Sequence, residues 1–174
     1  MLLSNELDNL QQGLQEHMAF EVKQMYSFRA ARQLDLLMSV HIWYHHTCCE
    51  LWGPWCKLDF RAHKDPLLAT APDTFLAACQ AKLFFHADQI SLIVQKVLEL
   101  VPEHDFPDVW LALCISDAAR IQILRYEDEL DLASKAKLTE LLKTNISVLY
   151  RMRIVHVLAD RCVSQVSCLR LDMS

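Results

Sequence analysis

The stretch from Leu34 to Trp52 constrains the fold more than any other part of this 174-residue chain. On a helix of about 3.6 residues per turn, its apolar residues go most of the way round instead of forming one stripe. These residues are Leu34, Leu37, Met38, Val40, Ile42, Trp43, Tyr44, Cys48 and Leu51. Such a helix is expected in the interior, with other helices packed around it. Gly53 and Pro54 follow, so we expect the helix to end there with Gly53 in the left-handed conformation.

Composition extends this expectation to the whole chain. The chain has only two glycines, and a sheet protein needs many glycine-containing turns. With 53% hydrophobic and 22% charged residues, the composition is that of a globular protein. The length fits one domain with a single core. We therefore predict that residues 1–174 form one all-α domain, a bundle of about five to six helices around the Leu34–Trp52 helix.

Three further helices are predicted from apolar residues spaced three and four apart. The first begins at Ser4, runs toward the central helix with little break, and buries Leu7, Leu10, Leu14, Met18 and Val22. The second begins after a Thr70 cap at Asp73, ends before Pro102, and buries Leu76, Cys79, Leu83, His86, Ile90, Ile93, Val97 and Leu100. The third begins at Asp105–Asp108 and buries Trp110, Leu113, Cys114, Ala118, Ile121 and Leu124. Residues 53–72 are predicted to be a long irregular connector that covers a pocket.

The last helix is predicted to begin at a Ser134 cap and to run to about Cys168. Its apolar seam has a heptad spacing and contains Leu138, Leu141, Asn145, Val148, Met152, Val155, Ala159, Cys162, Val166 and Leu169. A coiled-coil dimer with Asn145 fixing the register is one interpretation. Leu142, Leu149 and Val163 widen the apolar face, and a wide face favours a globular bundle.

Charge and cysteine content restrict the function classes. The net charge is −5 and no run of four basic residues occurs, so we predict no direct nucleic-acid binding. The N-terminus lacks a signal-peptide pattern. The apolar run Leu36–Cys49 is shorter than the roughly 20 residues that span a bilayer, so we expect a soluble intracellular protein without membrane contact. The seven cysteines are odd in number and sit mostly at apolar positions, which is typical of reduced core residues.

The central helix also contains the strongest candidates for metal or catalytic chemistry. His41, His45 and Cys48 or Cys49 share one helix face, and with Cys56 they offer tetrahedral zinc ligands. The alternative is that they fill the interior and satisfy their polar atoms locally. We favour this alternative because no Cys-x-x-Cys or His-Glu-x-x-His pattern is present, and because a helix C-terminus opposes thiolate formation. The sequence thus predicts no metal, no cofactor, no catalytic residue and no enzyme.

Other polar side chains are assigned structural roles. His86 lies in an apolar seam and is expected to hydrogen-bond to a neighbour. Asp117 and Arg120 are three residues apart on one predicted helix and are expected to form an ion pair. If a small molecule binds, the candidate pocket lies between the central helix and the following connector. Its residues would be His41, Trp52, Trp55, His86, Trp110 and Arg120.

The segment Val40-His41-Ile42-Trp43-Tyr44-His45-His46-Thr47-Cys48-Cys49-Glu50-Leu51 resembles the signature segment of the fungal-specific transcription factor domain, or middle homology region. Its signature residues here are Trp43, Tyr44, His45, His46, Cys48 and Cys49. Phe84–Ser91 and Ala119–Gln122 are similar to two further helical segments of that family. The resemblance extends from about Phe20 to Leu158. The chain lacks the family's six-cysteine zinc cluster and any Cys₂His₂ finger, and after Glu50 it departs from the family pattern.

The resemblance implies a nuclear, all-helical regulatory domain that modulates transcription through protein contacts. Its expected partners are the transcription machinery or the regulator itself, and a small-molecule effector is compatible with the family. DNA binding is not implied, because the DNA-binding module is missing. One alternative is a small-ligand-binding helical sensor. The less favoured alternative is a zinc-dependent enzyme that uses the His/Cys face of the central helix.

Overall fold

The computed structural model describes residues 2–56, 70–106 and 108–153. Within these residues it has six α-helices, one 3-10 turn and no strand. The elements are α1 (Leu2–His17), α2 (Val22–Ala30), α3 (Leu34–Trp52), η1 (Gly53–Trp55), α5 (Asp73–Leu100), α6 (Val109–Asp128) and α7 (Leu132–Arg153). The predicted all-α bundle is confirmed. Residues 57–69 of the predicted connector, and the predicted continuation of the last helix from Val155 to Leu169, lie outside the described residues.

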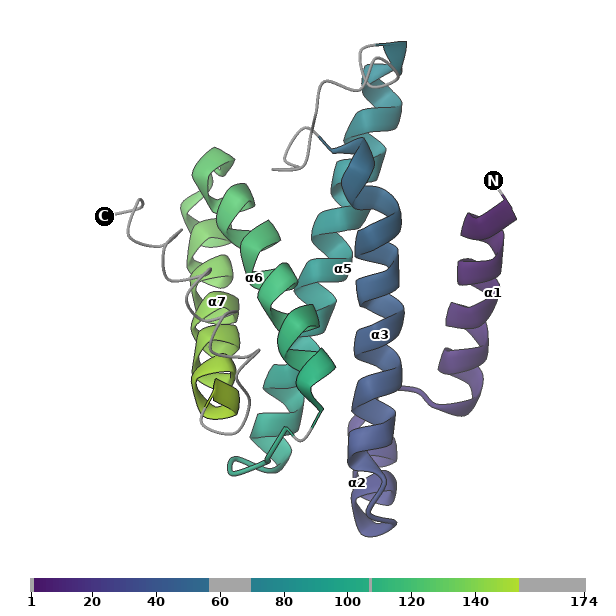
Figure 1. Cartoon of the computed structure of the whole chain (residues 1–174), viewed down its shortest axis with the longest axis vertical. Helices are drawn as coiled ribbons and strands as arrows, with labels where there is room; N and C mark the ends of the chain where they lie inside the picture. Colours follow the sequence, from purple (N-terminus) through teal and green to yellow (C-terminus); the bar gives the residue numbers. More distant parts are fainter. Residues whose placement is uncertain (1, 57–69, 107, 154–174) are drawn as a thin grey trace.

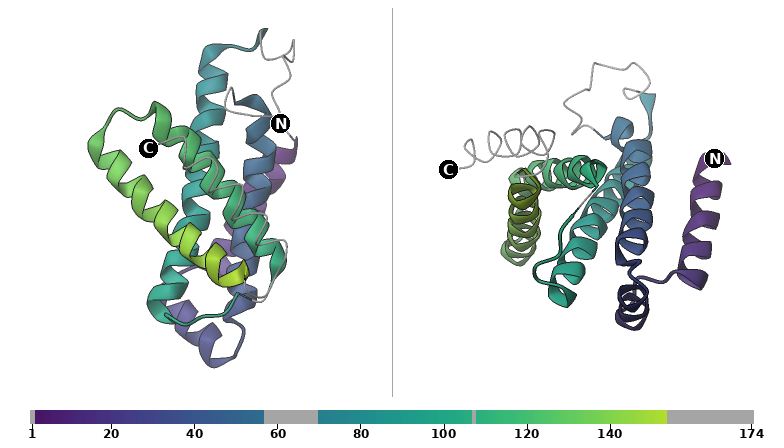
Figure 2. Two further views of the ribbon diagram at one scale, coloured as in Figure 1. Left: turned by 60° about the vertical axis from the view of Figure 1, so that its left-hand side comes forward. Right: turned by 60° about the horizontal axis from the view of Figure 1, so that its bottom comes forward.

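The helices pack with α5 in the middle. Figure 1 shows α1 on one side of α3 and α5 on the other, and Figure 2 shows α6 and α7 beyond α5. Helix α5 has 28 residues and contacts α3, α6, α7 and η1. Helix α2 packs at the beginning of α3. Among the described residues, no helix combines the length and the apolar composition that crossing a bilayer requires.

Helix α3 ends at Trp52 as predicted, but it is not covered on all sides. Leu37, Met38 and Ile42 are fully buried, whereas Leu36 and Trp43 are 53% and 52% exposed. Gly53 is also not left-handed: its φ is −53°, and the chain continues directly into η1. The reason is local, because the Cys56 amide donates to the Gly53 carbonyl and extends the winding with a tighter turn.

The N-terminal prediction was wrong about the start of the first helix and about continuity, since α1 begins at Leu2 and Ser4 lies within it. Helix α1 ends at His17, and α2 is a separate helix that begins at Val22. Val22 is 64% exposed and Leu10 is 50% exposed, so neither contributes to the core. Arg32 has φ 58°, a left-handed conformation that ends the α2 segment and redirects the chain into α3. A hydrogen bond of 2.8 Å from the Gln33 amide to the Phe28 carbonyl closes this turn.

Helix α6 begins as predicted, but the face that it buries in the core differs from the predicted one. Asp108 caps it, since its side chain accepts a hydrogen bond of 2.9 Å from the Trp110 amide. Trp110 and Leu113 were predicted inside, but they are 60% and 39% exposed. The buried residues are Leu111, Ala112, Cys114, Ile115, Ala118, Ala119, Gln122 and Ile123. The face is shifted because α6 packs on α5 and α7 at once, and contacts α3 as well.

Two predicted helix caps were also wrong. The N-cap residue of helix α5 is Pro72 instead of Thr70, and no side-chain hydrogen bond is made at this cap. At the start of α7 the Asp131 carboxylate accepts a hydrogen bond of 2.8 Å from the Ser134 amide. The capping residue is therefore Asp131, and Ser134 is the residue whose amide is capped.

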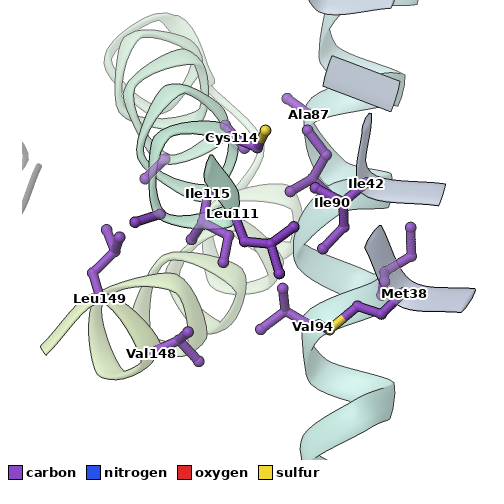
Figure 3. Close-up of a cluster of buried hydrophobic side chains, with 14 of the residues drawn as sticks. Met38, Ile42, Ala87, Ile90, Val94, Leu111, Cys114, Ile115, Val148 and Leu149 are labelled. Atoms are coloured by element: carbon purple, nitrogen blue, oxygen red, sulfur yellow. The ribbon is translucent and has the colours of Figure 1, made fainter. Parts of the chain in front are cut away.

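The core is apolar and continuous across α3, α5, α6 and α7. Figure 3 shows Met38 and Ile42 facing α5, and Leu111, Ile115, Val148 and Leu149 meeting on the other side. From α5 itself come Ala87, Ile90 and Val94, each fully buried. Helix α5 is covered by α3 on one side and by α6 and α7 on the other. This burial on two sides explains the length of the apolar seam predicted for α5.

A buried polar network joins α5, α6 and α7. Asn145 is fully buried, and its amide donates to Ser91 Oγ at 2.8 Å and to Gln122 Oε1 at 3.1 Å. Gln122 Nε2 donates to Ser91 Oγ at 2.9 Å and to Asp88 Oδ1 at 3.2 Å. Arg125 completes the network with a bond of 3.1 Å to the other Asp88 oxygen. The Asn145 amide group therefore bonds to α5 and α6 of its own chain.

Replacing Asn145 by alanine should destabilise the fold by about 1–3 kcal/mol, because the buried Gln122 carbonyl oxygen loses its donor. Urea unfolding of the purified chain would measure the change. Ser147→Ala, on the exposed side of the same helix, is the matched control and should stay within about 0.5 kcal/mol of the parent. Equal stability of the two variants would contradict the role given to Asn145.

Candidate functional site

His45 and His86 form a buried pair between α3 and α5. Their Nδ1 atoms lie 2.8 Å apart, and each residue is only 7% exposed. One ring must donate its Nδ1–H while the other accepts, so the two neutral rings hold opposite tautomers. Burial lowers the pKa of His45 to about 3 and that of His86 to about 4. The expectation that His86 hydrogen-bonds to a neighbour is confirmed.

A small cavity of about 190 Å³ lies beside this pair, between α1, α3 and α5. Its lining combines aromatic, charged and sulfur-containing side chains: Leu7, Asp8, Gln11, Tyr44, Cys48, Trp52, Lys82, Phe85 and His86. Tyr44 donates a hydrogen bond of 3.0 Å to Gln11, and Lys82 lies 4.2 Å from the centre of the Trp52 ring. Burial raises the pKa values of Tyr44 and Cys48, so both groups stay protonated at neutral pH.

The residues of the predicted pocket do not lie together around one cavity. Trp52 and His86 line the cavity described above. His41 instead hydrogen-bonds through Nε2 to the Met18 carbonyl at 2.7 Å, and Trp55 packs edge-on against Phe75. Trp110 is exposed, and Arg120 pairs with Asp117 at 3.5 Å as predicted. The cavity lies on the α1 side of α3.

The histidines and cysteines of α3 that were considered as zinc ligands do not converge on a common point. His41 is engaged by a backbone carbonyl and His45 by His86. The Cys49 thiol faces the Leu83 carbonyl at 3.9 Å, and burial raises its pKa. The Cys56 thiol lies 3.3 Å from the Trp52 carbonyl. Each of these side chains therefore contacts a different neighbour in the interior.

A different group of donor atoms does converge, between α3 and α6. The donor atoms of His46, Glu50 and Asp117 all lie within 4.8 Å of one another, the one such group of three His, Cys, Asp or Glu residues in the described part of the chain. His46 Nε2 is 3.2 Å from Asp117 Oδ2. Hydrogen bonding to Asp117, and then to Cys114, raises the pKa of His46 to about 10. His46 is therefore a cation at neutral pH, whereas His45 beside it is neutral.

This polar group lies on a surface that also carries large apolar side chains. Figure 1 shows α3 and α6 running in the same direction, and on each helix a large apolar residue lies one turn before His46 or Asp117 on the same helix face. These residues are Trp43 and Leu113, with exposures of 52% and 39%. Trp110 follows one turn further toward the start of α6. We call Trp43, His46, Glu50, Trp110, Leu113 and Asp117 the α3/α6 face.

Sequence reasoning missed this face as a unit. It paired Asp117 with Arg120 and placed His46 in the signature segment, but it did not connect the two residues. His46 and Glu50 are one turn apart, which is a usable signal for a shared helix face. Asp117 lies 71 positions from His46, and only knowledge of the α3–α6 contact brings them together.

Comparisons with known proteins add no family to this geometry. No family model, no curated protein and no solved structure matches the chain. The resemblance of the Val40–Leu51 segment to the fungal transcription factor domain therefore stays a sequence-based prediction.

Acid should destabilise the protein through the His45–His86 pair. In the unfolded chain both histidines titrate near 6.5, and in the folded chain near 3 and 4. The stabilisation that comes from the neutral His45–His86 pair is therefore fully present above pH 6.5. It is lost as the pH falls below 6.5, because the unfolded state then binds more protons than the folded state. The expected loss is about 2 kcal/mol per histidine by roughly pH 5.

Urea unfolding at about pH 7.5 and about pH 5 would measure this loss. A His45→Gln/His86→Gln variant keeps polar atoms in place but has no group that titrates there, so its stability should fall much less. The acid-induced loss of stability in the single variant His86→Gln should be intermediate between the losses in the parent and in the double variant. The same acid loss in parent and double variant would show that the pair does not carry the pH dependence.

Proposed function

We propose that this chain is a regulatory, protein-interaction domain. It resembles the middle region of fungal transcription factors and modulates transcription in the nucleus through protein contacts, without binding DNA itself. The observation that carries the proposal is the α3/α6 face, where Trp43 and Trp110 are 52% and 60% exposed on two rigid helices. Large exposed apolar side chains with a polar surround are typical of protein-binding sites, and tryptophan is enriched at their energetic centres.

The chemistry of the interior supports a binding role over a catalytic one. Its histidine pair is held neutral by burial, and burial raises the pKa values of Cys48, Cys49 and Cys79. Nucleophilic cysteines need the opposite shift. The net charge of −5 supports partners other than nucleic acid. The signature segment supplies Trp43 and His46 to the α3/α6 face, which links the resemblance to the proposed surface.

A small-ligand sensor is the second candidate, and the cavity beside His86 favours it. Lys82, Asp8 and Tyr44 offer charge and hydrogen bonds to a polar ligand there. Its volume of about 190 Å³ is below the roughly 300–1,000 Å³ of sites for drug-sized molecules. A ligand at this site would have few atoms. A thermal-shift screen with small polar compounds tests it, because a ligand selective for the folded state raises stability.

Tethering the whole chain to an unrelated DNA-binding domain in a fungal reporter strain tests the regulatory proposal. Reporter output should change several-fold relative to the DNA-binding domain alone. A Trp43→Ser/Trp110→Ser variant should return output to the baseline, because it removes the apolar contacts of the α3/α6 face. The untethered chain should not shift a DNA duplex in an electrophoretic assay.

The matched control is a Tyr26→Ser/Leu132→Ser variant. These residues are 56% and 82% exposed on other helices, so the change removes as much exposed apolar area away from the face. It should keep the full reporter effect. No effect of the parent chain, or an unchanged effect in the Trp43→Ser/Trp110→Ser variant, would contradict the proposal.

A further inference from the structure

We propose that His46, Glu50 and Asp117 bind a divalent transition-metal ion of the zinc class, which bridges α3 and α6. The inference does not rest on the proposed regulatory function, although the three residues belong to the α3/α6 face, and it differs from the His41/His45/Cys48 zinc face considered from the sequence. It rests on one imidazole nitrogen and two carboxylate oxygens that two packed helices bring together.

The distances fit an ion with modest side-chain adjustment. Zinc binds imidazole nitrogen and carboxylate oxygen at about 2.0–2.2 Å, so tetrahedral ligand atoms lie roughly 3.4 Å apart. His46 Nε2 and Asp117 Oδ2 are already 3.2 Å apart. Glu50 lies one turn beyond His46 on the same helix, and it is exposed enough to rotate its carboxylate inward. The three donor atoms, all within 4.8 Å of one another, need only a small contraction.

The donor types select among metals. An imidazole with two carboxylates suits zinc and its transition-metal neighbours, whereas calcium and magnesium prefer oxygen ligands alone. Three protein ligands leave a fourth position that water would fill.

A neighbouring residue orients one of the ligands, as residues that hydrogen-bond to metal ligands commonly do. Arg120 Nη1 lies 3.5 Å from Asp117 Oδ1, so it holds one carboxylate oxygen while Oδ2 faces His46. Such hydrogen bonds to the far atom of a ligating side chain fix its orientation. Because His46 is protonated when it pairs with Asp117, a metal ion must displace that proton to bind, and the two carboxylates then compensate the charge of the ion.

Zinc titration of the purified full chain tests the site. After chelator treatment and dialysis, isothermal titration at about pH 7.5 should show one equivalent of Zn²⁺ bound, and saturating zinc should raise the thermal midpoint. His46→Gln, Glu50→Gln and Asp117→Asn should each weaken binding by at least about 10- to 100-fold. All three variants keep every cysteine, so loss of binding cannot come from loss of thiols.

His104→Gln is the matched control. His104 Nε2 lies 2.9 Å from Asp35 Oδ1, a second histidine–carboxylate pair, and the described residues offer it no third ligand. This variant should keep full zinc affinity. Glu50→Gln changes an exposed side chain, so a folding defect would not explain its effect. Absence of stoichiometric binding by the parent, or parental affinity in Glu50→Gln and His46→Gln, would show that His46 and Asp117 form an ion pair only.

Discussion

Two-sided burial of α5 is the constraint on which the rest of the structure depends. A helix of 28 residues is roughly 42 Å long, so it can serve as a common wall for several neighbours. Helix α3 covers one side, and α6 and α7 cover the other. Apolar contacts alone would allow these helices to slide, because one methyl-rich surface packs about as well as the next. The Ser91–Gln122–Asn145 network removes that freedom, since a displaced helix would leave buried amides unpaired.

The position of α3 on this wall then decides the chemistry of its histidines. Consecutive residues on a helix are rotated by about 100°, so His45 points at α5 while His46 points toward α6. His45 meets the neutral His86 and loses its hydration, which lowers its pKa. His46 meets the Asp117 carboxylate at a half-buried position, which raises its pKa. His45 and His46 therefore differ in charge at neutral pH because they project from α3 in directions about 100° apart.

Much of the fold could be predicted from the sequence because its signals are local. The end of α3, the start and end of α5, and the beginning of α6 follow from Gly53-Pro54, Asp73, Pro102 and Asp108. The inner face of α6 could not be predicted, because Trp110 and Leu113 are as apolar as core residues. Hydropathy does not distinguish an apolar residue that faces a neighbour from one that faces solvent.

The candidate site was harder to predict than the fold for a related reason. The sequence places many donor atoms on α3, and chemical type alone pointed to His41, His45 and the two cysteines. Each of these is satisfied by a different neighbour: Met18, His86 or Leu83. Convergence requires a partner from a distant segment, and Asp117 became that partner only when α6 packed against α3. The hydrogen-bonded network of Asp88, Ser91 and Gln122 was not predicted for the same reason. Asn145 alone was singled out in the sequence, because it is a polar residue in an apolar seam.

The α3/α6 face couples its apolar and charged parts physically. Trp43 and Leu113 lie one turn from the His46–Asp117 pair, which is still partly hydrated, with side-chain exposures of 19% and 21%. Any partner that covers these apolar residues also removes water from the pair, and the interaction between the charges strengthens as the local dielectric falls. Loss of water also penalises both charges, and the Asp117 hydrogen bond raises the pKa of His46 while burial already lowers it. By linkage, a partner that covers this surface and a proton on His46 would change each other's binding by the same factor, and the balance of these two effects sets its direction.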